Sequence, residues 1–166
     1  EVTAGWDFNC VLDESGVVCW GFNEHDQTTV PALNSPTKID AGESHTCAVV
    51  TTGIECWGWN DSGQTEVPVL RNPTKVRGGD MHTCVIADAV LRCWGSDDYG
   101  QTSIPTLTNP TWVGTGDAHS CAIADEGVKC WGSNSDGQTD VPSLTNPRHV
   151  DGGAFHSCAL VEDGVA

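Results

Sequence analysis

The stretch HTCAVVTTGIEC brings histidine and cysteine close together, and these are residues that can bind metals or act in catalysis. His45 precedes Cys47 by two residues, and Cys56 follows Cys47 by nine. Such side chains can bind zinc, and a Cys–His pair can act as a nucleophile with its base. The spacing of the two cysteines, however, fits neither a zinc knuckle nor the CXXC motif of reactive dithiols. We therefore interpret the stretch as architecture and predict no catalytic, cofactor or metal site in it.

The stretch recurs with a period of 37 residues, and a fixed period decides the architecture before any local motif does. A histidine stands two residues before a cysteine at His45, His82, His119 and His156, and Trp-Gly follows each second cysteine. A catalytic pair has no reason to occur in every unit. The period divides the chain into repeats 1–37, 38–74, 75–111 and 112–148 and a partial repeat 149–166. We expect one repeat domain that is a fragment of a longer array.

Within one repeat the apolar residues alternate as they do in β-strands. Side chains of residues 47–50 and 54–57 alternate between two partly apolar faces, which predicts a hairpin covered on both faces. Gly53 closes the connection and places the two cysteines opposite each other, at a separation that a disulfide can bridge. Val90 replaces this glycine in one hairpin, so we expect that turn to differ. The predicted disulfides are Cys10–Cys19, Cys47–Cys56, Cys84–Cys93 and Cys121–Cys130.

Two more short strands, at residues 37–40 and 64–68 and their equivalents, would complete each repeat. Four strands make one small sheet, and small sheets with two apolar faces bury them by packing radially around an axis. The predicted fold class is therefore all-β, with tandem 37-residue four-stranded blades in a β-propeller or an open propeller-like array.

The repeat resembles that of the regulator of chromosome condensation family in its short bacterial-type form. The residues that carry the resemblance are Gly42, His45, Cys47, Gly53, Cys56, Trp57, Gly58, Asn60, Gly63 and Gln64. It covers the whole chain, although the first repeat has Phe8 in the histidine position and Asp26 in place of a glycine. Family members form seven-bladed propellers that mostly bind other proteins, so the resemblance implies that fold and a protein partner. The namesake's nucleotide exchange on chromatin and a relative's inhibition of β-lactamases do not transfer, because no motif for either is present.

The composition excludes several classes of function. With 7 Lys and Arg against 23 Asp and Glu, the formal net charge is −16, which argues against nucleic acid and anionic membranes as partners. No run of 18 apolar residues offers a membrane span. Nine cysteines at regular spacing indicate an oxidising compartment, and hence a secreted or cell-surface protein.

Three groups of residues outside the cysteine framework are candidates for binding. Residues 60–63, 97–100 and 134–137 supply oxygen ligands that could hold calcium, although the same residues are ordinary turn formers. Asn60 also begins a glycosylation sequon. Three tryptophans outside the repeated set either line a sugar- or protein-binding surface or pack between blades, namely Trp6, Trp59 and Trp112.

The last repeat is incomplete and suggests an edge for assembly. The strand predicted from Ser157 to Val161 lacks the hairpin partner of the earlier repeats, and Cys158 lacks a disulfide partner. We expect the missing strand to come from further along the same polypeptide or from a neighbouring copy, and the second case would give a head-to-tail filament. The sequence thus predicts an extracellular, non-enzymatic repeat protein that binds protein partners or copies of itself. The alternatives are a subunit of an extracellular structural fibre and a carbohydrate-binding propeller module.

Overall fold

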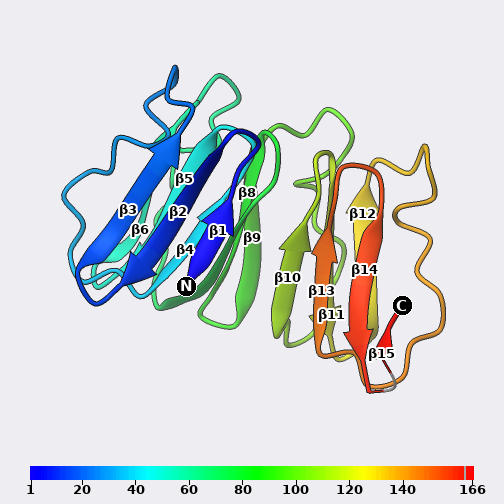
Figure 1. Ribbon diagram of the computed structural model, residues 1–166. Helices are drawn as coiled ribbons and strands as arrows, with labels where there is room; N and C mark the ends of the chain where they lie inside the picture. Colours follow the sequence, from blue (N-terminus) through cyan, green and yellow to red (C-terminus); the bar gives the residue numbers. More distant parts are fainter. Residues whose placement is uncertain (163) are drawn as a thin grey trace.

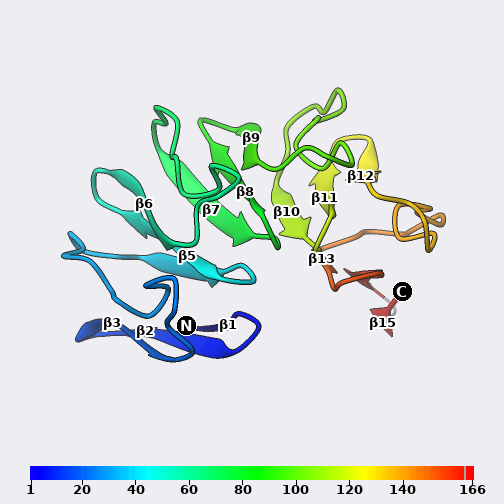
Figure 2. The same cartoon turned by 90° about the horizontal axis from the view of Figure 1, so that it is seen from above.

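The computed structural model describes residues 1–162 and 164–166, which form fifteen β-strands and no helix. The strands make five small antiparallel sheets, each with its strands in sequence order. The sheets stand side by side as blades in an arc (Figure 1), and their first strands face the inside of the curve (Figure 2). This is the arrangement of β-propeller blades. No described segment is a helix long and apolar enough to cross a membrane.

Each blade has an inner, a middle and an outer strand. The inner strands are β1 (Val2–Ala4), β4 (Lys38–Ala41), β7 (Pro73–Gly78), β10 (Trp112–Thr115) and β13 (His149–Gly152). The middle strands are β2 (Phe8–Asp13), β5 (His45–Val50), β8 (His82–Ala87), β11 (His119–Ala124) and β14 (Ser157–Val161). The outer strands are β3 (Gly16–Gly21), β6 (Gly53–Gly58), β9 (Val90–Gly95), β12 (Gly127–Gly132) and β15 (Gly164–Val165). Strands β5, β8 and β11 are buried along their whole length because neighbouring blades cover both of their faces.

The predicted fourth strand is wrong for the described residues, because residues 64–68 and their equivalents form a turn and an irregular connection. The N–H of Glu66 donates to the carbonyl of Gly63 at 3.0 Å. The buried side chain of Gln64 accepts the N–H of Ser62 at 3.0 Å, which holds the loop closed before a strand can begin. Pro68 has no N–H to give to a β-ladder. Each blade therefore has three strands.

The hairpins of the first four blades each carry a disulfide between directly opposed residues. The bonds are Cys10–Cys19, Cys47–Cys56, Cys84–Cys93 and Cys121–Cys130, with Cα atoms 4.0 to 4.1 Å apart. Gly53 follows a two-residue turn with a φ of 143°, which only glycine adopts readily. The turn before Val90 differs, as expected, because the positive φ angles fall on Asp88 (49°) and Ala89 (59°). Val90 therefore keeps the extended backbone that a β-branched residue prefers.

The hydrophobic core is divided among the interfaces between neighbouring blades, which we call seams one to four from the N-terminus. In seam two, Cys47 and Val49 of β5 pack against Val76 and Val85 of the third blade. The cysteine-bearing face of each blade thus meets the opposite face of the next one. Since both faces are removed from water, every repeat needs the two apolar faces that the sequence shows.

The last repeat pairs its middle strand with the final residues of the chain. In β14 and β15, Leu160 lies opposite Val165 and Val161 opposite Gly164. Val161 is thus paired within the same polypeptide, which is one of the two sources expected for the missing strand. Assembly through Ser157 and Cys158 stays a prediction. Cys158 has a free, exposed thiol.

Candidate functional site

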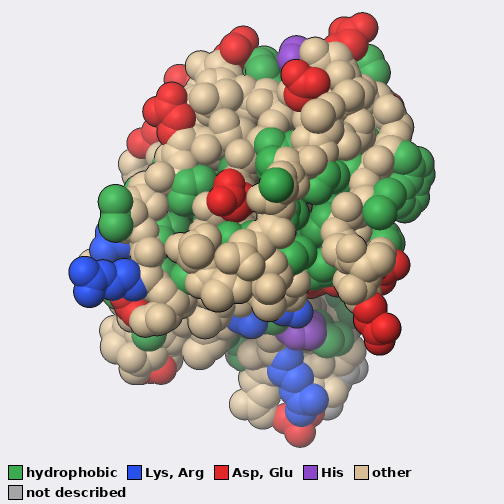
Figure 3. All heavy atoms as spheres, turned by 90° about the vertical axis from the view of Figure 1, so that its left-hand side faces the viewer, with side chains coloured by type: hydrophobic (Ala, Val, Ile, Leu, Met, Phe, Trp, Pro, Cys, Tyr) green, Lys and Arg blue, Asp and Glu red, His purple; other side chains and the backbone are tan. Residues whose placement is uncertain are grey.

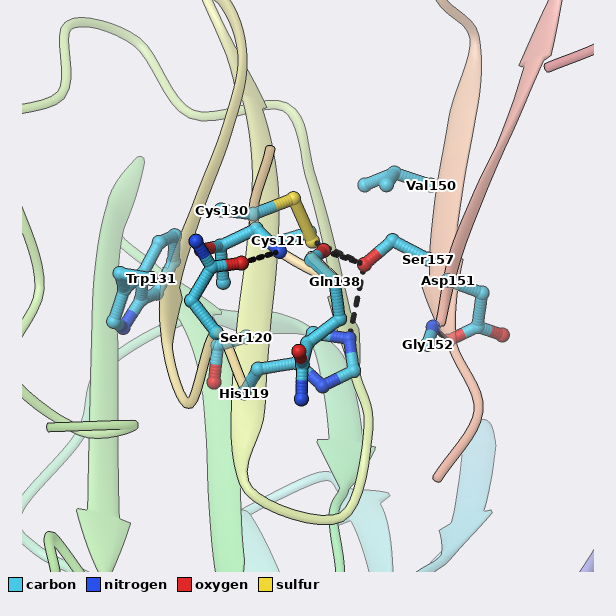
Figure 4. Close-up of a disulfide and its surroundings, with 12 residues drawn as sticks. His119, Ser120, Cys121, Cys130, Trp131, Gln138, Val150, Asp151, Gly152 and Ser157 are labelled. Atoms are coloured by element: carbon cyan, nitrogen blue, oxygen red, sulfur yellow. Dashed lines mark hydrogen bonds between the residues drawn. A yellow bond between two sulfur atoms is a disulfide. The ribbon is translucent and has the colours of Figure 1, made fainter. Parts of the chain in front are cut away.

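The recurring histidines lie inside the seams. His45 is fully buried, and its Nε2 lies 2.9 Å from Oγ1 of Thr83 in the next blade. The Thr83 hydroxyl donates in turn to the carbonyl of Gln64 at 2.9 Å. The same relay recurs as His82–Ser120–Gln101 and His119–Ser157–Gln138, the second of which is seen in Figure 4.

The hydroxyl in each relay fixes the protonation of its histidine. Because the Thr83 proton goes to the Gln64 carbonyl, the Thr83 oxygen must accept the proton on Nε2 of His45. Nδ1 of His45 is then a bare nitrogen, buried without a partner among the described residues. Burial lowers the pKa of His45 to about 4, so the ring is neutral at physiological pH. The neutral ring thus connects the second blade to the third through Thr83.

The repeated tryptophan and glutamine belong to the same arrangement. The indole Nε1 of Trp94 donates to the Gln64 carbonyl at 3.0 Å, so this carbonyl accepts two hydrogen bonds from the third blade. Trp57 and Trp131 make the equivalent bonds, both at 2.9 Å, to the carbonyls of Gln27 and Gln101. These recurring residues thus connect neighbouring blades.

One loop position of each blade faces the inside of the arc at the upper ends of the inner strands (Figure 1). The residues at this position are Trp6, Glu43, Asp80, Asp117 and Ala154, and they line a hollow of about 260 Å³. A hydrogen bond to Asp80, followed by burial and the charges of Asp80 and Asp117, raises the pKa of Glu43 to about 8. Glu43 therefore keeps its proton at neutral pH. We call the hollow and its five residues the upper loop surface.

The lower ends of the inner strands carry a different set of residues. The position that begins each inner segment holds Glu1, Lys38, Lys75, Trp112 and His149. Lys38 pairs with Glu1 at 3.7 Å, and Arg77 lies 3.6 Å from Asp40. Burial raises the pKa of Asp40 to about 6, although the charge of Arg77 and the N–H of Gly78 oppose this rise. In Figure 3, Lys, Arg and His side chains gather at the lower end of the molecule, beside a hollow.

The turn clusters considered for calcium use their oxygens on their own backbone. Oδ1 of Asn60 accepts the N–H of Thr65 at 3.0 Å, and Oδ1 of Asp97 accepts that of Thr102 at 2.8 Å. In the part of the chain that is described, no group of three or more His, Cys, Asp or Glu side chains is placed to hold a metal ion. Calcium binding in these turns stays a prediction. Asn60 is exposed, and its glycosylation stays a prediction as well.

Three segments of the chain, residues 1–27, 37–64 and 113–138, match the family model of the regulator of chromosome condensation (RCC1) repeat. These three segments are RCC1 repeats. No curated protein sequence matches it.

Solved structures similar to this RCC1-repeat chain include two plant receptor kinases. The ectodomain of CR4 from Physcomitrella patens is 26% identical with a TM-score of 0.84, over 98% of this chain and 48% of that one. The CRINKLY WD40 ectodomain of ACR4 from Arabidopsis thaliana is 25% identical with a TM-score of 0.77, over 97% and 58%. Prp20p from Saccharomyces cerevisiae is 19% identical with a TM-score of 0.80, over 96% and 55%, and shows the fold alone. The chain spans about half the length of these structures.

The RCC1-repeat chain uses its three additional tryptophans differently. Trp59 stacks on His25, with ring centroids 5.4 Å apart. Trp112 packs against His149 of the next blade at 4.2 Å and donates to the carbonyl of Val150 at 3.0 Å. Trp6 is 77% exposed and belongs to the upper loop surface. Packing between blades thus accounts for Trp112, whereas the side chain of Trp6 is left exposed to solvent.

Sequence reasoning missed both ends of the inner strands in this RCC1-repeat chain. It followed the residues that are identical in every repeat, whereas Glu43, Asp80, Lys38 and Lys75 stand at positions that vary. A comparison of residues 37 positions apart could have found them, because side chains one period apart become neighbours around the arc.

Proposed function

We propose that this chain is part of a secreted, non-enzymatic RCC1-repeat propeller that binds a protein partner through its upper loop surface. The observation that carries the proposal is Trp6, whose side chain is 77% exposed beside the carboxyl groups of Glu43 and Asp80. Tryptophan is the residue most enriched among those that dominate protein–protein binding energy. A large aromatic ring left in water at the rim of a hollow supports a role in contact with another molecule.

The charge of the surface favours a basic partner. Glu43, Asp80 and Asp117 stand at equivalent positions of three successive blades, and the chain as a whole carries a net charge of −16. A Lys or Arg side chain that enters the hollow would relieve the repulsion between these carboxyl groups. It could also stack on the indole of Trp6.

The disulfides and the receptor ectodomains support an extracellular setting. Four bonded cysteine pairs are stable in an oxidising compartment. The two plant structures, at 26% and 25% identity, are ectodomains of receptor kinases. A partner that is itself secreted or displayed on a cell surface follows from this setting.

A site-directed photo-crosslinking experiment tests the proposal. A photoreactive amino acid at position 6 is compared with one at position 69, where Val69 is 97% exposed but lies outside the upper loop surface. In the extracellular fluid of the source organism, we expect position 6 alone to give a crosslinked protein, and the yield to fall with added salt and with the Asp117→Asn substitution. The same products from both positions would refute the assignment of the surface. A crosslinked dimer would indicate self-assembly, and a crosslinked glycan would indicate the carbohydrate-binding alternative.

A further inference from the structure

The lower end of the inner strands gathers cations in a protein that has few of them. The chain has seven Lys and Arg against 23 Asp and Glu. Three of the seven, Lys38, Lys75 and Arg77, line one hollow of about 110 Å³ together with Trp112 and Glu1. Their positions follow from the fold, because Lys38 and Lys75 begin equivalent inner segments one period apart.

Two of these cations have hydrogen-bonding capacity that nothing in the described structure uses. Lys38 pairs with Glu1, and Arg77 pairs with Asp40. Lys75 forms no ion pair within the described ranges, and its ammonium lies 4.3 Å from the centre of the Trp112 ring. Nε of Arg77 is buried and has no hydrogen-bond partner there. A donor that is buried and unsatisfied costs free energy, which an added acceptor would recover.

The size of the hollow decides what kind of group could provide the acceptor. A volume of about 110 Å³ is well below the 300 Å³ or more of pockets that hold drug-sized ligands. It is large enough for one carboxylate or phosphate group. The Trp112 ring forms one wall and is held in place by its bond to the Val150 carbonyl. Arg77 also lies over this ring, 5.2 Å from its centre.

We infer that this hollow is a binding site for a small oxyanion, held by Lys75 and Arg77, whose charged groups lie over the Trp112 ring. The shared chemistry of the ligand is a carboxylate or phosphate group, whose oxygens accept charge-assisted hydrogen bonds from ammonium and guanidinium donors. Glu1 opposes binding, since it places a negative charge at the same hollow and holds Lys38. The site is separate from the upper loop surface, which lies at the other end of the inner strands.

If the site exists, two substitutions should change the affinity for an oxyanion in opposite directions. Lys75→Gln removes the unpaired cation and should weaken oxyanion binding about tenfold or more. Glu1→Gln removes the opposing charge, releases Lys38 and should strengthen binding. Lys129→Gln is the matched control, because Lys129 is an exposed lysine of strand β12 that does not line the hollow. It should leave the affinity unchanged.

The experiment is a titration of the whole chain with sodium phosphate and with sodium acetate, each at constant ionic strength maintained with sodium chloride. Binding is followed by the ¹H–¹⁵N signal of the Trp112 indole, assigned with the Trp112→Phe variant. A saturable shift with phosphate, acetate or both, weakened by Lys75→Gln but not by Lys129→Gln, supports the site and identifies the oxyanion. No shift at tens of millimolar of either salt overturns it, and so does an equal response of the two lysine variants. If Lys75→Gln does not fold, the Glu1→Gln variant decides, and unchanged affinity in that variant overturns the site.

Discussion

Seam one differs from the three later seams at one buried position. Phe8 stands where His45, His82 and His119 stand in the following blades, and it is only 1% exposed. The Thr46 hydroxyl still donates to the Gln27 carbonyl, at 3.2 Å, although no histidine donates to it. The same backbone therefore accepts either an apolar ring or a neutral imidazole in this place. The difference shows that the histidine is not needed for the blade to form, and that it adds a polar connection which depends on pH.

Removing the ring from a histidine seam should have the largest effect on stability. We expect His82→Ala to lower the free energy of unfolding by about 3 kcal/mol or more, because it leaves a cavity and takes the donor from Ser120. His82→Phe, which copies seam one, should cost clearly less. Urea unfolding followed by tryptophan fluorescence measures both variants. If the two variants lose the same stability, filling the space of the imidazole with an apolar ring does not restore the seam.

Acidification should affect the histidine seams and spare seam one. Burial holds the pKa of His45 at about 4 in the folded chain, against 6.5 for the free side chain. The unfolded chain therefore binds more protons below pH 6.5, and stability falls as the pH drops from 6.5 towards 4, by up to about 3 kcal/mol for this histidine.

The effect of pH is measured as a difference between the wild type and the His45→Phe variant, in urea unfolding at several pH values. Carboxyl groups such as Glu43 titrate in both proteins, so their contributions largely cancel in the difference. We expect the stability advantage of the wild type over the variant to shrink on acidification. A difference that stays constant from pH 7 to pH 4 would contradict a buried neutral His45.

The disulfides should stabilise equally a blade at seam one and a blade at the seams that contain a histidine. Cys10–Cys19 and Cys84–Cys93 each join residues nine apart, so the chain-entropy model gives a loss of about 2.7 kcal/mol for either double Cys→Ser variant. Both variants are made with Cys158→Ser, which removes the free thiol as a source of exchange. Thermal unfolding gives the values. A much larger loss for one pair would mean that its seam, and not the closed loop, determines the contribution.

The smallest effect is expected when a histidine seam is built at seam one. Phe8→His places an imidazole where Thr46 can accept its proton, so stability at pH 7 should change by no more than about 1 kcal/mol. The variant should, however, become less stable than the wild type as the pH falls towards 4. Unfolding at pH 7 and pH 4 tests this. A large loss at pH 7 with no added sensitivity to acid would show that the relay depends on more than the residue at this position.

Much of each blade could be predicted from local sequence patterns. Alternating apolar residues on both sides of Gly53 indicate the hairpin, and the hairpin places Cys47 opposite Cys56. The fourth strand was wrongly predicted because residues 64–68 resemble a short strand that ends at Pro68, whereas the side chain of Gln64 closes a loop. That bond is not visible in a polarity pattern, since a glutamine is polar whether it faces water or the protein interior.

The sequence by itself determined the period, the hairpins and the disulfide pairs, because these depend on contacts between residues close together in the chain. Only the tertiary structure decided what the repeated and variable residues do. His45 meets Thr83 38 positions away, and Lys75 meets Trp112 one period away. Neither pair is within reach until neighbouring blades pack face to face. The physical reason is that the hydrophobic effect brings the blades together through their repeated apolar faces, and this packing then places residues one period apart side by side.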